Sequence, residues 1–159
     1  EAPYETFLNQ LNTETTVILK KASEINTIPA NSKVIVGFHK DNSTAYKPYK
    51  ISDSSKKVLS DLSKNQTVIL DVFGSPYALK DIDISKVSTV LVSYENNDDA
   101  MKATVTGLLG QTKIWGRLPV LVNDNLKFGI GMDVDAKITT NQTDRKNSSE
   151  TKNSKTVIE

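Results

Sequence analysis

The sequence predicts an α/β fold: a three-layer αβα sandwich of the flavodoxin-like kind, with a mostly parallel sheet and an irregular C-terminal tail. Continuous apolar runs of strand length indicate strands buried on both faces. These runs alternate with segments whose apolar residues recur at helical spacing, and such alternation places helices on both faces of a parallel sheet. The runs lie at 33–38, 67–73 and 88–94.

A helix and a short extended segment are expected before the first buried strand. The apolar stripe of the helix is Tyr4, Phe7, Leu8 and Leu11. Its i, i+3, i+4, i+7 spacing predicts an amphipathic helix, and Pro3 suits a first turn. The β-branched run at 15–19 predicts a strand, and residues 22–32 predict a connection.

Two further helices are predicted after the first and third buried strands. Ser52 and Asp53 are a helix start signal ahead of an apolar stripe at Val58, Leu59 and Leu62. After the third run, residues 96–99 supply capping acceptors and negative charge. The apolar face that follows is Met101, Val105, Leu108 and Leu109. Gly110 fits the position just beyond the helix end.

The chain after Gly110 is expected to be extended and then irregular. Residues 114–122 predict a loop and an extended segment, with Pro119 better suited to an edge than to a central strand. We interpret the remainder to Met132 as a return segment, so residues 1–132 form the domain. Residues 133–159 are mostly polar, which is typical of a tail or of a linker to another domain.

Composition excludes several classes of function. A net charge of +1, from 20 lysine and arginine against 19 acidic residues, gives no field that would recruit nucleic acid. There is no apolar run of about 18 residues, so no membrane span is expected. With no cysteine and one histidine, His39, thiolate and histidine-rich metal sites are excluded, and neither a metal nor another cofactor is expected.

Polar side chains follow each buried run, where parallel strands bring their C-terminal ends to one edge of the sheet. Ligands of open α/β sheets bind at this edge, so these residues are candidates for a substrate rim or an interface. They are His39, Lys40, Asp41, Ser75, Tyr77, Glu95 and Asn96.

A serine hydrolase triad is one hypothesis for this edge, with Ser75 as nucleophile, His39 as base and Glu95 as orienting carboxylate. Pro76 directly after the serine removes the backbone N–H that a nucleophile elbow uses for its oxyanion hole. The alternative is that all three are hydrogen-bonded turn or cap residues.

Other polar or aromatic motifs have structural interpretations beside functional ones. Asp71 lies inside a strand, which suits a structural hydrogen bond. Residues 98–99 resemble a metal pair but are explained by helix capping, and the glycine pair in 129–131 predicts a tight turn. Trp115 suits core or interface packing, with stacking on a sugar as the alternative.

Four blocks of sequence resemble the C-terminal domain of family 3 glycoside hydrolases. The blocks are 68–79, 87–94, 108–110 and 116–120. Residues 34–40 resemble an earlier strand and turn of the branch that includes β-N-acetylhexosaminidases. Together the similarity extends over about residues 4–132 and leaves the tail outside it.

The resemblance implies a two-domain parent enzyme. In that family a (β/α)8 barrel binds the sugar and carries the aspartate nucleophile, and the sandwich domain packs beside it. In the β-glucosidase branch the sandwich lends a glutamate acid/base. The comparable turn here, 39–42, contains no glutamate, which favours the β-N-acetylhexosaminidase-like branch. The resemblance also implies bacterial cell-wall or glycan turnover and an exported parent, at the periplasm or cell surface.

We therefore expect a non-catalytic accessory domain whose partner is the barrel and which shapes substrate access. Retaining glycosidases need two carboxyl groups flanking one bond, so the isolated chain is expected to be inactive. The alternative is an independent module that binds carbohydrate or another small ligand at the sheet edge, through His39, Ser75, Tyr77 and Glu95.

Overall fold

The computed structural model describes residues 4–41 and 49–137 and confirms the predicted α/β fold. Its sheet has three parallel strands in the order β1 (Lys33–His39), β2 (Thr67–Phe73), β3 (Thr89–Val92). The register pairs Gly37 with Asp71 and Asp71 with Leu91. The central strand β2 is therefore the one whose side chains are most completely enclosed.

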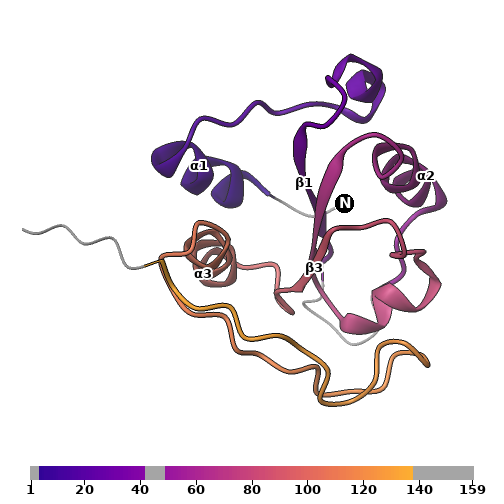
Figure 1. Ribbon diagram of the computed structural model, residues 1–159, viewed down its shortest axis with the longest axis vertical. Helices are drawn as coiled ribbons and strands as arrows, with labels where there is room; N and C mark the ends of the chain where they lie inside the picture. Colours follow the sequence, from indigo (N-terminus) through magenta and orange to yellow (C-terminus); the bar gives the residue numbers. More distant parts are fainter. Residues whose placement is uncertain (1–3, 42–48, 138–159) are drawn as a thin grey trace, which may run out of the picture.

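Helices cover both faces of the sheet, so the molecule has three layers (Figure 1). Helices α1 (Glu5–Glu14) and α3 (Asp98–Leu108) pack together on one face. Helix α2 (Asp53–Leu62) lies on the other, beside the 3₁₀ helix η1 (Ala22–Thr27). A second 3₁₀ helix, η2 (Pro76–Asp81), follows β2.

Alternate residues of β2 divide the apolar core in two, because successive side chains of a strand point to opposite faces. Val68, Leu70 and Val72 pack with α2, whereas Phe73 packs with α1 and α3. The α2 side also contains Leu59, Leu62, Ala78, Leu79, Leu118 and Val122. The α1/α3 side contains Phe7, Leu11, Met101 and Val105.

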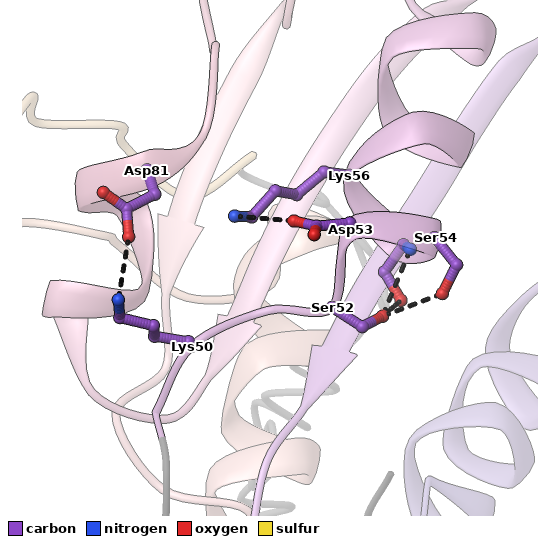
Figure 2. Close-up of polar contacts among 7 residues, drawn as sticks. Lys50, Ser52, Asp53, Ser54, Lys56 and Asp81 are labelled. Carbon is purple, nitrogen blue, oxygen red and sulfur yellow. Dashed lines mark hydrogen bonds and ion pairs between the residues drawn. The ribbon is translucent and has the colours of Figure 1, made fainter.

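The predicted helix boundaries at α2 and α3 are confirmed. The Ser52 hydroxyl accepts a hydrogen bond from the Ser55 amide at 3.2 Å. An ion pair from Lys50 to Asp81, shown in Figure 2, ties the approach to α2 to η2. Asn97 caps α3 by accepting from the Ala100 amide at 2.8 Å. Gly110 ends α3 with a left-handed backbone, φ +74°.

The strand predicted at 15–19 is wrong. This segment is a link between α1 and η1, and Ile18 is 79% exposed. Since α1 packs on one face of the sheet and η1 beside α2 on the other, the link must cross between the two layers. A β-branched run forms a strand only where a neighbouring strand is available to pair with it.

The flanking strands are less buried than their apolar sequences predict. Most residues of β1 and all described side chains of β3 are half-buried or exposed, and β3 is shorter than the predicted run at 88–94. Each pairs with β2 alone among the described residues, so both are edge strands. Burial on both faces holds for β2 only.

Residues 111–137 form an antiparallel ribbon, seen in orange in Figure 1, so the return segment that was predicted to end at Met132 continues through Val134 to Lys137. Backbone hydrogen bonds join Ile114 to Val134 in both directions, at 2.8 and 2.9 Å, and the Leu118 amide to the Ile130 carbonyl at 2.8 Å. A further bond, from the Lys137 amide to the Gly110 carbonyl, fixes the end of the ribbon to the end of α3. Of the tail predicted at 133–159, residues 133–137 belong to this ribbon, and the remainder lies outside the described residues.

Among the residues described, no helix has both the length and the apolar character needed to cross a bilayer.

Candidate functional site

Two of the predicted site residues meet at the C-terminal edge of the sheet. His39, the last residue of β1, lies with its Nδ1 2.7 Å from Oδ1 of Asn96, in the loop between β3 and α3. Because an amide oxygen can only accept, Nδ1 of His39 carries the proton in this bond. The contact joins residues 57 positions apart in the chain.

The imidazole of His39 is enclosed by aromatic rings and is only 7% exposed. It stacks on Phe73 at the end of β2, with ring centroids 4.4 Å apart and planes 10° from parallel. Phe7 and Tyr4, from α1 and its N-terminal flank, lie at 5.8 and 6.1 Å. The ring therefore sits beneath α1 and not in the open mouth that a substrate-facing base requires.

Gly37 leaves the space into which the His39 ring folds back. A Cβ at position 37 would lie 2.6 Å from Nε2 of His39, closer than side chains pack. The absence of a side chain at this position of β1 thus lets the imidazole lie flat along the sheet.

Lys40 and Asp41 continue β1 beyond the sheet. The Lys40 amide donates to the Phe73 carbonyl at 3.0 Å, so the pairing with β2 extends one residue past the end of β1. Gly74 accommodates the Lys40 side chain, because a Cβ at position 74 would lie 3.2 Å from the Cβ of Lys40. Asp41 is exposed.

The hydrogen bonds of Ser75 and Glu95 are those of turn and cap residues, the alternative to a catalytic triad. Ser75 precedes η2 and its hydroxyl accepts from the Tyr77 amide at 3.4 Å. Glu95 accepts from the Asn97 side-chain amide at 2.5 Å, which orients the residue that caps α3. A triad of Ser75, His39 and Glu95 thus gains no support from these contacts. Tyr77 is exposed and faces Tyr49 at 6.2 Å between ring centroids.

The turn that presents Asn96 begins at Tyr94, which has a left-handed backbone with φ +62°. This conformation is uncommon for a bulky residue and marks a place where the surrounding structure holds the chain against its local preference. Here it turns the chain sharply after β3, ahead of Asn96 and the cap of α3.

Asp71 is the second polar feature of the α1/α3 layer, and it is fully buried in the middle of β2. Ser93 donates its hydroxyl to Oδ1 of Asp71 at 2.9 Å, and Oγ of Ser93 lies 2.5 Å from Oγ1 of Thr104 on α3. The predicted structural hydrogen bond is confirmed. The other carboxylate oxygen, Oδ2, has no hydrogen-bond partner among the described residues.

Burial changes the acidity of Asp71. It raises the pKa to about 6 from an ordinary 3.8, against smaller opposing effects of the hydrogen bonds from Ser93 and from the Val72 backbone. The carboxyl group is thus one whose charge changes in mildly acidic solution.

A cavity of about 180 Å³ lies at the opposite edge of the sheet, near the N-terminal ends of β1 and β2. Its wall is formed by η1, the last turn of α2 and the loop before β2. The lining residues are Ile25, Asn26, Ile28, Ala30, Asp61, Leu62, Asn65 and Gln66. Within 4–41 and 49–137, no three His, Asp or Glu side chains are grouped closely enough to hold a metal ion.

Comparison with protein-family models, with curated proteins and with solved structures finds no match to this chain.

The candidate residues lie at the predicted edge of the sheet, whereas the aromatic surroundings of His39 and the cavity at the other edge are not evident from the sequence. The stripe of Tyr4 and Phe7 was a detectable signal, because an amphipathic helix must pack its apolar face against something. Asn26 and Gln66 belong to polar connections without a motif, and nothing in their local sequence indicates a cavity.

The remaining motifs are also resolved by the structure. Trp115 is 71% exposed, so the prediction that it packs in the core of this domain is wrong. Its role in an interface stays a prediction. The glycine pair at 129–131 forms the predicted turn: Gly129 has φ +81°, and the Ile130 amide bonds to the Lys127 carbonyl at 3.2 Å.

Proposed function

We propose that this chain is a non-catalytic accessory domain that packs against the (β/α)8 barrel of a family 3 glycoside hydrolase and shapes access to its substrate site. The proposal combines the sequence resemblance with one structural observation, the apolar surface that the ribbon leaves exposed. The sequence at 39–42 contains no glutamate, which favours the hexosaminidase-like branch.

The exposed apolar surface lies on the return segment of the ribbon. Ile130, Met132 and Val134 stand at every second position, so in an extended chain they share one side. Met132 is 77% exposed, and Phe128 at the preceding turn is 75% exposed. A run of large apolar side chains in contact with water is typical of a surface that another protein covers.

The ribbon is a firm platform for such a contact. Leu118 and Val122 of its first segment are buried in the core beside α2. Its two segments are held together by Arg117, which bonds to Asp133 at 2.6 Å, and Gly131 lies directly against the Gly116 carbonyl. An interface built on a preformed surface loses little conformational entropy on binding.

The proposal separates binding from catalysis. A retaining glycosidase needs two groups on either side of the scissile bond, and at this sheet edge Glu95 orients the cap of α3 while His39 lies beneath aromatic rings. The role that fits these residues is structural: His39 joins the end of β1 to the loop after β3 through Asn96, and Glu95 orients the cap of α3.

A binding experiment with a barrel tests the proposal. The chain is mixed with the barrel of a family 3 β-N-acetylhexosaminidase that lacks its own sandwich domain, and complex formation is followed by size-exclusion chromatography with light scattering. We expect a one-to-one complex that F128S/M132S abolishes. The matched control is I18S, which changes an equally exposed apolar residue outside the ribbon.

Three results would contradict the proposal. One is a complex that F128S/M132S leaves intact. Another is self-association of the chain through the ribbon in place of binding to the barrel. The third is turnover of a chromogenic N-acetylglucosaminide by the isolated chain.

A further inference from the structure

We infer that the link between α1 and η1 (residues 15–21) is a pairing strand, through which two copies of this chain join as antiparallel strands in a weak dimer. In Figure 1 the link runs along the outside of the molecule. The inference does not rest on the proposed docking of the ribbon, because the link and the ribbon share no residue.

The link is an extended segment that presents apolar side chains to water. Both of its ends have an extended backbone, with φ −155° and ψ 155° at Thr15 and φ −81° and ψ 158° at Lys21. Ile18 is 79% exposed and Leu19 is 54% exposed, whereas Val17 packs against the core beneath α1. An exposed strand of β-branched and apolar residues is a template for pairing with another strand.

The hydrogen bonds of the link leave one of its two edges open. On the side of α1, the Thr15 amide donates to the Leu11 carbonyl at 2.8 Å and the Val17 amide to Oδ1 of Asn12 at 3.4 Å. Because successive amides of an extended chain point to opposite sides, the amides at positions 16, 18 and 20 point away from α1. None of these three amides has a hydrogen-bond partner in the described part of the chain. The outer edge of the link can therefore accept a strand.

The sequence of the link indicates that this strand comes from a second copy. When two links lie antiparallel with Val17 opposite Val17, position 16 faces position 18 and position 14 faces position 20. Thr16 and Ile18 of the two copies then exchange their amide–carbonyl bonds through the open edges. Glu14 faces Lys20 at both ends of the pairing, so opposite charges meet twice. A parallel arrangement would bring like charges together instead.

The small size of this contact makes the dimer weak. A few residues from each copy provide little area compared with the roughly 1,200–2,000 Å² of a stable interface. We therefore expect a Kd of about 0.1–1 mM. At micromolar concentrations such a dimer is dissociated, so it leaves the stoichiometry of the proposed barrel complex unchanged.

A nuclear magnetic resonance dilution series tests the inference, with the chain between about 1 mM and about 20 μM. We expect concentration-dependent amide shifts within residues 14–20, larger at positions 16 and 18 than at positions 15 and 17. I18P removes one of the pairing amides and should abolish these shifts. Since this amide has no hydrogen bond within the described residues, the proline should leave the fold intact.

A charge exchange gives a second, independent test. Glu14 and Lys20 are both exposed, so E14K and K20E should fold. In buffer of low ionic strength, each should weaken the dimer at least about threefold, because like charges then face each other at both ends. The double variant E14K/K20E restores opposite charges and should return the Kd to about that of wild type. The control K127E changes an exposed lysine outside the link and should have no effect.

Three results would overturn the inference. One is an absence of concentration-dependent shifts up to about 1 mM, where a dimer of this affinity is populated. Another is a set of shifts located in residues 128–134, which would place self-association on the ribbon. The third is a double variant that binds no more tightly than E14K or K20E alone.

Discussion

At the scale of single residues, Asp71 is a carboxyl group that the fold buries completely. Its carboxyl group lies in the centre of the middle strand, with one oxygen bonded to Ser93 and the other without a partner in the described part of the chain. Burial of a carboxyl group favours its neutral form, and this is why the pKa rises to about 6.

The raised pKa predicts how stability changes with pH. Between the ordinary value of 3.8 and about 6 the folded state holds more protons than the unfolded state, so the free energy of unfolding decreases as pH rises through this range. The contribution of Asp71 is complete below the lower value and is lost above the higher one. A shift of about two pKa units corresponds to about 3 kcal/mol.

We predict that D71N removes this dependence. Urea unfolding at several pH values between 4 and 7 should show wild type losing stability relative to D71N as the pH rises, by up to about 3 kcal/mol. The matched control is D124N, which changes an exposed carboxyl group. Parallel curves for wild type and D71N across the range would contradict the prediction.

His39 and Asn96 show what could be inferred about individual site residues. His39 ends β1 and Asn96 follows β3, and parallel strands end at a common edge, so their proximity was predictable. Their hydrogen bond and the stacking on Phe73 depend on Gly37, on the backbone of Tyr94 and on the packing of α1. These are long-range conditions that no local pattern encodes.

Individual helices and strands depend on local signals to different degrees. Ser52 was identified as a start signal because its side chain can satisfy an amide that the first turn of a helix leaves without a partner, and it does so for α2 (Figure 2). The run at 15–19 has the composition of a strand but crosses between the layers instead.

For α2 we predict that S52A destabilises the protein by about 1 kcal/mol, because the Ser55 amide loses its acceptor. Thermal unfolding followed by circular dichroism measures the effect. The control is S60A, at an exposed position within the same helix, where alanine should be neutral or slightly stabilising. Equal effects of the two substitutions would show that the cap contributes nothing.

For the molecule as a whole, the ribbon determines how the domain meets its surroundings. One segment closes the core beside α2 through Leu118 and Val122, while the other turns large apolar residues outward. The same element thus completes the fold and, in our proposal, provides the interface.

Because the ribbon has a buried and an exposed side, we predict a large loss of stability for one of its leucines and almost none for another, three positions away. Leu118 is 7% exposed, so L118A should destabilise the protein by about 2–5 kcal/mol through the lost burial and the cavity left behind. Leu121 is 62% exposed, and L121A should change the free energy of unfolding by less than about 0.5 kcal/mol. Chemical denaturation of both variants makes the comparison, and a large loss for L121A alone would mean that the ribbon packs differently.

The local order of residues was enough to predict the α/β class, the three helices, the central strand, and the capping signals at Ser52, at residues 96–99 and at Gly110. Those features depend on periodicity and on backbone groups satisfied within a few residues, so neighbouring positions in the chain contain the information. Contacts between distant segments produce the other features. These are the enclosure of His39, the raised pKa of Asp71, the cavity beside Gln66 and the exposed apolar face of the ribbon. Burial and hydrogen bonding at these places are properties of the assembled layers, and they exist only after the chain has folded.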